Sequence, residues 1–190
     1  MQLENINKEE EKNIPEDSHV LHFWQPCKFE INDEFTFVND NFIFNTFSNL
    51  LYMIAYPLLL IINKFFFGFK IEGKENLENI DSGKVTISNH VHPMDCTMVG
   101  LANVPNKTFF TSLETNFKIP IVRSIIKLLN AVPIPQNIKY TRKFMSSIDE
   151  LLKNNKTVHF YPEGSLWPNY EKIRHFKNGA FDFAVRNNVP

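Results

Sequence analysis

Between Asp40 and Lys64 the sequence has no charged residue, and this stretch restricts the possible folds more than any other feature. Its central part, Leu50–Ile62, is almost entirely apolar and continues after Lys64 into a cluster of phenylalanines. A helix that spans a bilayer needs about 20 predominantly apolar residues, but Pro57 interrupts this block. We therefore expect a kinked interfacial or re-entrant helix within residues 41–70, rather than a full span. A buried core helix is the alternative.

Lysines 64, 70 and 74 follow the apolar stretch. Phenylalanines next to lysines are typical of a segment anchored at a membrane interface, with the positive charge in the cytosol. The N-terminus, which includes Glu9, Glu10 and Glu11, lacks the basic and then apolar order of a secretory signal. Two cysteines are too few for a disulfide framework, which favours a reducing compartment. We expect a membrane-associated protein on the cytoplasmic face.

The charge is unevenly distributed along the chain. Residues 1–106 carry 7 basic and 15 acidic side chains, a net charge of -8, whereas residues 107–190 carry 13 and 6, a net charge of +7. The whole chain has a formal net charge of -1, so we expect no nucleic-acid partner, while the second half favours anionic partners. We interpret residues 1–40 as an acidic arm followed by a lead-in of short strands or irregular structure.

After Gly73, short apolar segments alternate with helical patterns. We predict strands at 84–88, 107–112, 131–134 and 157–161, and helices at 94–102, 121–129, 141–152 and 180–186. This alternation predicts an α/β fold, with a largely parallel or mixed sheet flanked by helices. Residues 71–190 then form one domain. Because the chain stops where the next strand would start, we expect this domain to be truncated at its C-terminal end.

A polar cluster, Asn89–Asp95, follows the first predicted strand. Parallel α/β sheets build their sites where a strand ends and a helix begins. If a helix begins at Pro93, the Asp95 carboxylate can turn back towards His90, fix the tautomer of its imidazole, and stabilise the imidazolium that forms when the other nitrogen accepts a proton. Taken alone, the spacing is equally that of an ordinary helix start, where the helix dipole favours an acidic residue.

A second polar cluster, Tyr161–Ser165, follows the last predicted strand and can lie beside the first cluster at the same sheet edge. Glu163, Gly164 and Ser165 offer a carboxylate, backbone N–H groups and a hydroxyl to a polar head group. The alternative is a strand-ending turn with no ligand.

Together the two clusters resemble motifs of the glycerolipid acyltransferases, the family typified by the 1-acylglycerol-3-phosphate acyltransferases. Asn89 and His90 followed by Asp95 resemble the family's His-x4-Asp block, and Tyr161–Ser165 resembles its Phe-Pro-Glu-Gly-Thr block. Residues 176–181 are similar to the family's Phe-Lys-x-Gly-Ala stretch. The ordered set is more specific than any single block.

The resemblance implies a glycerolphosphate-acyltransferase-like fold and transfer of a fatty acyl group to a hydroxyl of a membrane lysolipid such as 1-acylglycerol-3-phosphate, in phospholipid biosynthesis. The implied donor is an acyl-CoA or acyl-carrier-protein thioester, with no metal and no bound cofactor. It implies His90 as the base and Asp95 as its orienter. The implied acceptor-binding residues are Asn89, Glu163, Gly164 and Ser165.

Two positions depart from the family. Gln136 and Leu166 stand where the family has arginines, whose planar guanidinium groups are suited to binding a phosphate. Either nearby cations hold a phosphate, with Lys172, Arg174 and Lys177 as candidates, or the acceptor is not a simple phosphomonoester. Two further interpretations stay open: a non-catalytic membrane lipid-binding relic of this family, and a phosphate-ester hydrolase that uses the histidines with a metal.

Overall fold

The computed structural model describes residues 27–78 and 80–190. The predicted acidic arm and the start of the lead-in lie outside the described residues. Between residues 27 and 41 the chain has no regular secondary structure, so the irregular alternative for this part of the lead-in is confirmed. It nevertheless contributes Phe29, Ile31 and Phe37 to the core.

Four strands form one sheet in which every paired neighbour is parallel, with the order β1-β4-β2-β3. Their bounds are Lys84–Ile87 for β1, Thr108–Leu113 for β2, Ala131–Ile134 for β3 and Thr157–Phe160 for β4. All four lie within one residue of the predicted strands. The predicted α/β fold class is confirmed.

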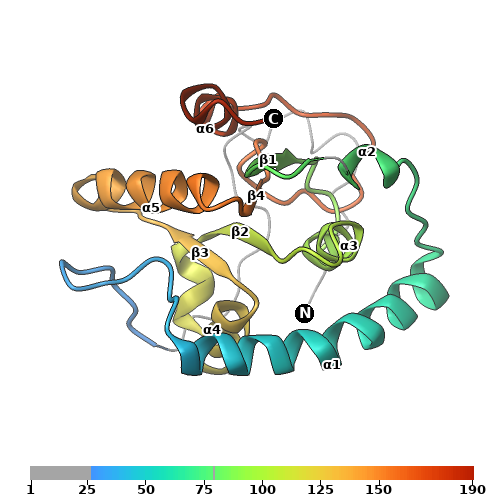
Figure 1. Cartoon of the computed structure of the whole chain (residues 1–190), viewed down its shortest axis with the longest axis horizontal. Coiled ribbons are helices and arrows are strands. Elements are labelled where there is room, and N and C mark those ends of the chain that lie inside the picture. Colours follow the sequence, from blue (N-terminus) through green and yellow to red (C-terminus); the bar gives the residue numbers. More distant parts are fainter. Residues whose placement is uncertain (1–26, 79) are drawn as a thin grey trace, which may run out of the picture.

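Helices account for most of the remaining described domain. The α-helices are α1 (Phe42–Phe67), α2 (Glu75–Glu78), α3 (Asp95–Ala102), α4 (Pro120–Leu128), α5 (Thr141–Lys153) and α6 (Gly179–Asn187), and the 3-10 helices are η2 (Glu114–Lys118) and η3 (Ile138–Tyr140). Helices α5 and α6 cover one face of the sheet, while α3 and α4 lie on the other with α1 beyond them (Figure 1). The sequence pattern missed α2 and both 3-10 helices, which are too short for a helical period to show.

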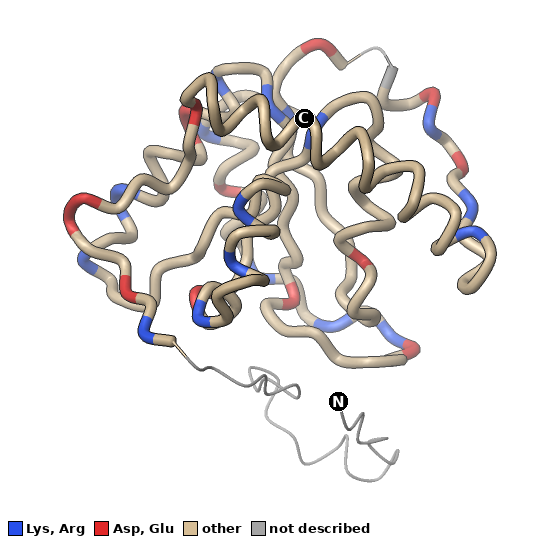
Figure 2. The backbone as a smooth tube through the Cα atoms, turned by 90° about the horizontal axis from the view of Figure 1, so that it is seen from below, with Lys and Arg blue, Asp and Glu red and all other residues tan. Residues whose placement is uncertain are grey.

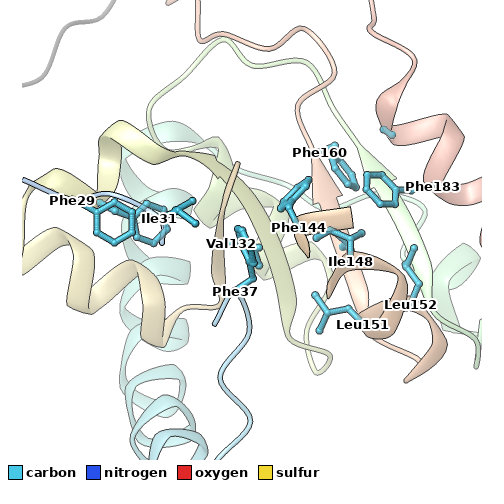
Figure 3. Packing of buried hydrophobic residues seen from close by; sticks show 13 residues of the cluster. Phe29, Ile31, Phe37, Val132, Phe144, Ile148, Leu151, Leu152, Phe160 and Phe183 are labelled. Carbon is cyan, nitrogen blue, oxygen red and sulfur yellow. The ribbon is translucent and has the colours of Figure 1, made fainter. Parts of the chain in front are cut away.

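The main core lies between the sheet and helices α5 and α6 (Figure 3). The apolar face of α5 is buried, and its Ile148 and the β4 residue Val158 are both fully buried in the same core cluster. The ring of Phe160 stacks on that of Phe183 of α6, with centroids 5.3 Å apart. Because residues alternate along a strand, Val158 and Phe160 face this core whereas His159 points to the opposite face, towards α3.

Helix α1 runs through Pro57 as one helix from Phe42 to Phe67. A proline inside a helix removes one N–H from the ladder and crowds the carbonyl four residues earlier, which bends a helix without necessarily ending it. The side chain of Asn41 caps the first turn by accepting from the N–H of Phe44, and Gly68 ends the helix in the left-handed conformation with φ 61°. Its length and apolar composition suffice to cross a membrane, and 11% of its most apolar window is buried, so it is not a core helix.

The side of α1 that faces the domain is polar. The Ser48 hydroxyl donates to the carbonyl of Leu128 (2.8 Å), and the Tyr52 hydroxyl donates to the carbonyl of Leu129 (2.9 Å), both at the C-terminal end of α4. Fifteen residues after Ser48, the side-chain amide of Asn63 donates to Thr97 Oγ1 of α3 (3.0 Å). At 1.5 Å per residue these hydrogen bonds hold about 22 Å of α1 against the domain.

Candidate active site

The two predicted polar clusters lie side by side at the carboxyl edge of the sheet, because β1 and β4 are parallel neighbours. The Glu163 carboxylate joins them: its Oε2 accepts from the backbone N–H of His90 (3.0 Å). The backbone N–H of Trp167 also donates to the carbonyl of His90 (3.1 Å). The loop that carries His90 is therefore fixed from the β4 side.

The His90 imidazole is paired with the Asp95 carboxylate, with Nδ1 and Oδ2 3.0 Å apart. The same Oδ2 accepts the backbone N–H groups of Val91 and His92, each at 2.9 Å. A carboxylate oxygen that already accepts two backbone N–H groups also acts as an acceptor towards the imidazole. Nδ1 of His90 then carries the proton and donates it to Asp95, which leaves the Nε2 lone pair as the acceptor.

The helix after this loop begins at Asp95, not at Pro93 as predicted. Residues 92–94 form a turn instead, in which His92 Nδ1 accepts the backbone N–H of Met94 (3.1 Å). The helix therefore starts two residues later than predicted. Asp95 still occupies the first turn of α3, as expected.

The Nε2 atom of His90 has no hydrogen-bond partner among the residues that the structure describes. The His90 side chain is 22% exposed, so the imidazole is not fully buried. The imidazole stacks on the ring of Tyr161, with centroids 3.9 Å apart and planes at 15°. One nitrogen is thus bonded to Asp95, one ring face is covered, and the other nitrogen is available to a ligand.

A buried histidine that the sequence analysis overlooked lies next to this pair. His159 is 1% exposed, its Nδ1 lies 3.0 Å from Thr86 Oγ1, and its Nε2 lies 3.3 Å from Ser88 Oγ. Since the Ser88 hydroxyl donates to the carbonyl of Asn89 (3.0 Å), it can only accept from His159, so Nε2 carries the proton. Burial, reinforced by the nearby His90, lowers the pKa of His159 to about 3, so this ring is neutral.

His159 therefore connects β4 to the backbone just before His90, and its ring also meets that of Tyr161 edge-on at 4.6 Å. The sequence contained a signal for it. His159 alternates with Val158 and Phe160 in a strand that is otherwise apolar, so a polar side chain points to the same face as the site.

The polar groups of the second cluster are largely used within the protein. Glu163 is buried and its Oε1 accepts the backbone N–H of Arg174 (3.1 Å). The guanidinium of Arg174 donates to Ser165 Oγ (2.9 Å) and lies 4.1 Å from the ring centroid of Trp167. Gly164 is the exposed member of the cluster and has φ 77°, a conformation that favours glycine.

The structure also positions the remaining predicted residues. Asn89 and Lys177 are exposed, and the Lys177 ammonium lies so close to Gly164 that an added Cβ would come within 3.2 Å of it. Gln136, which stands where the family has an arginine, is exposed and its backbone N–H donates to the buried Glu114 carboxylate (2.8 Å). Leu166 is half-buried.

Cys96, the second residue of α3, is exposed. Within residues 27–78 and 80–190 no three His, Cys, Asp or Glu side chains are grouped so that they could hold a metal ion. A cavity of about 320 Å³ between the lead-in and β3 contains none of the predicted site residues.

The end of α1 reaches the site. The ring of Phe67 meets the ring of His92 at 4.9 Å, and Asn63 is hydrogen-bonded to Thr97 of α3. The exposed apolar helix and the His90–Asp95 pair are therefore joined through α3 and its N-terminal turn.

Fold and site define a class of α/β proteins in which a histidine–carboxylate pair lies at the carboxyl edge of a parallel sheet, next to an exposed apolar helix. A model of the acyltransferase family matches residues 68–190. The chain therefore belongs to the acyltransferase family, and the resemblance to glycerolipid acyltransferases is confirmed.

Two curated proteins are similar to this chain in sequence. The chain is 28% identical over 166 residues to a chloroplast 1-acyl-sn-glycerol-3-phosphate acyltransferase of Arabidopsis thaliana, with 76% of this chain and 45% of that protein covered. It is 29% identical over 126 residues to a protein of the same description from Brassica napus, with 66% and 36% covered. The chain thus spans less than half the length of these curated relatives. No solved structure matches it.

Proposed function

We propose that this chain is an O-acyltransferase that moves a fatty acyl group from an acyl thioester to a hydroxyl of a membrane lysolipid. The observation that carries this proposal is the 3.0 Å contact between His90 Nδ1 and Asp95 Oδ2, which leaves Nε2 as a base. A base and its orienter at the carboxyl edge of a parallel sheet suit removal of a hydroxyl proton.

The proposed reaction uses His90 twice. Nε2 accepts the proton of the lysolipid hydroxyl as its oxygen attacks the thioester carbonyl carbon, and Asp95 stabilises the imidazolium that results. The tetrahedral intermediate then expels the thiolate, which takes the proton from Nε2. A lipid alcohol is almost fully protonated at neutral pH, so a positioned base contributes about 100- to 10,000-fold to the rate.

The substrates are proposed from chemistry and from the names of the relatives. Both relatives are named as 1-acyl-sn-glycerol-3-phosphate acyltransferases, which favours a lysolipid phosphate as acceptor in phospholipid biosynthesis. The exposed Lys172 and Lys177 lie on the loop that follows Gly164 and are the candidates to meet a phosphate. Acyl-CoA and acyl-carrier protein are both suitable donors.

Exposed apolar residues of α1 favour membrane contact on the cytoplasmic side, where Lys64, Lys70 and Lys74 follow the helix core. This brings a water-insoluble acceptor to the end of α1, next to His92. The divisions at residues 40 and 70, between arm, membrane segment and acyltransferase domain, stay predictions.

The test is acyl transfer by the purified chain in lipid vesicles. Labelled acyl-CoA or acyl-carrier protein is supplied with lysophosphatidic acid or with neutral monoacylglycerol. We expect diacylated product, more from the phosphate-bearing acceptor, and about 100-fold less with Asp95→Asn. Lys177→Ala should raise the KM for the phosphate-bearing acceptor and leave the KM for the neutral acceptor unchanged. If no donor and acceptor pair yields product, the enzyme proposal is wrong and the lipid-binding relic remains.

A further inference from the structure

The outward face of α4 is apolar although it lies on the protein surface. On this nine-residue helix Ile121 is 77% exposed, and Val122 and Ile125 are exposed as well. Scattered apolar side chains are ordinary on a surface, but a contiguous group on one short helix marks a contact with something apolar. Helix α4 lies beside the N-terminal half of α1, where Ser48 and Tyr52 join the two helices (Figure 1).

The outer face of α1 has the same character along its whole length. Its exposed large apolar residues are Phe42, Ile43, Phe47, Leu50, Met53, Ile54, Leu58, Leu60, Ile61, Phe65, Phe66 and Phe67. Its buried side chains, in contrast, are the polar Ser48, Tyr52 and Asn63. An amphipathic helix on a protein in water buries its apolar side and exposes its polar side, whereas α1 does the opposite. Such a helix is suited to an apolar medium outside the domain.

The charges within these two helices have one sign. Neither α1 nor α4 contains an acidic residue, whereas α1 carries Lys64 and α4 carries Arg123 and Lys127. Figure 2 shows basic residues in blue and acidic residues in red along the backbone. Arg123 and Lys127 lie over the ring of the buried Phe29, at 5.8 and 5.9 Å, on the side of α4 away from Ile121 and Ile125, so they do not interrupt the apolar face. Basic residues on membrane-bound helices complement the head groups of anionic lipids.

We propose that α4 is a second lipid-binding element, and that α1 and α4 together lay the domain on an anionic bilayer with the axis of α1 in the membrane plane. The hydrogen bonds of Ser48, Tyr52 and Asn63 hold α1 along the domain, so α1 cannot cross the bilayer without breaking them. This inference rests on the proposed membrane contact of α1, but not on acyl transfer.

The first test is flotation of the full chain with phosphatidylcholine vesicles that contain or lack phosphatidylglycerol. Ile121→Asp combined with Ile125→Asp should lower partitioning at least about tenfold, because two charges replace apolar contacts. The matched control is Val185→Asp, a residue 80% exposed on α6 at the other end of the molecule (Figure 1). Wild-type binding should require phosphatidylglycerol and weaken as salt is added.

A second test does not depend on how the aspartate variants fold. Ile121→Trp adds a fluorophore on α4, and Val185→Trp adds one on α6. Brominated lipids should quench the added emission of Ile121→Trp and leave that of Val185→Trp unchanged. A second copy of the chain is the competing occupant of this face, so the mass of each variant in solution is measured by light scattering.

Three results would overturn the proposal: equal partitioning of the α4 and α6 aspartate variants, no quenching of Ile121→Trp, or a wild-type dimer that the α4 aspartates dissociate. All three are read from vesicles and solution mass without any acyl donor. A chain that binds vesicles but transfers no acyl group would therefore contradict the proposed enzyme activity while leaving this inference intact.

Discussion

The imidazole of His90 lies flat against the phenol ring of Tyr161, with centroids 3.9 Å apart and planes at 15°. Asp95 holds the ring at Nδ1 and Tyr161 covers one of its faces, so the two contacts together restrict the rotation of the imidazole. The Tyr161 hydroxyl itself is buried and has no hydrogen-bond partner among the described residues. Burial raises the pKa of this phenol, so it stays protonated.

Tyr161→Phe is expected to keep acyl transfer within about twofold and to raise the free energy of unfolding by about 1 kcal/mol, because it keeps the stack and removes a buried unpaired hydroxyl. Phenylalanine is also the residue of the family motif that Tyr161 resembles. Tyr161→Leu loses the stack and should lower kcat. Urea unfolding and single-substrate kinetics measure both effects. A large fall in kcat for Tyr161→Phe would mean that the hydroxyl takes part in the reaction.

Glu163→Gln is expected to lower both stability and kcat. Its two oxygens accept the backbone N–H groups of His90 and Arg174, and an amide has one acceptor oxygen, so one buried N–H loses its partner. This costs about 1–3 kcal/mol, and a shift of the His90 backbone misplaces Nε2.

Glu171→Gln, an exposed change on the same loop, is the control and should affect neither quantity. A positioning role predicts that kcat falls while KM for the thioester stays constant. If KM alone rises, Glu163 binds substrate directly and the positioning account is wrong.

Stability should depend on pH through His159. Its pKa is about 3 in the folded protein and about 6.5 in the unfolded chain, so the unfolded state binds an extra proton between these values. The free energy of unfolding therefore falls as the pH drops from about 6.5 towards about 3, by up to roughly 1.4 kcal/mol per pH unit.

His159→Phe should be less stable at pH 7, because Thr86 and Ser88 lose their partner, but its stability should fall less steeply on acidification. His175→Gln, at an exposed position, should keep the wild-type slope. Urea midpoints at pH 7 and pH 5 give the comparison. Parallel acid profiles for wild type and His159→Phe would show that His159 is not the titrating group.

The sheet and the His90–Asp95 pair could be predicted because both depend on local sequence. The apolar strands end at polar clusters, and the short separation of Asp95 from His90 limits the positions that its carboxylate can take. Pro57 by itself does not predict whether the helix ends or continues, since a proline can kink a helix without breaking it. That judgement needs the flanking turns as well as the proline.

Other features depend on contacts between distant segments, which no local pattern contains. The sequence of α1 did not reveal its polar side, because that side is defined by the hydrogen bonds of Ser48 and Tyr52 to the end of α4. Arg174 looked like a surface cation in the sequence, but Ser165 and Trp167 enclose it. The role of His159 could not be predicted without knowing which face of β4 borders the site.

The most direct test of the account is the rate of acyl transfer to lysophosphatidic acid by His90→Ala, compared with His175→Ala, an exposed histidine outside the site. Because His90 Nε2 is the proposed base, His90→Ala should lower kcat by about 100-fold or more, with unchanged vesicle binding, while His175→Ala stays within about twofold of wild type. Full activity of a folded His90→Ala would contradict the central claim.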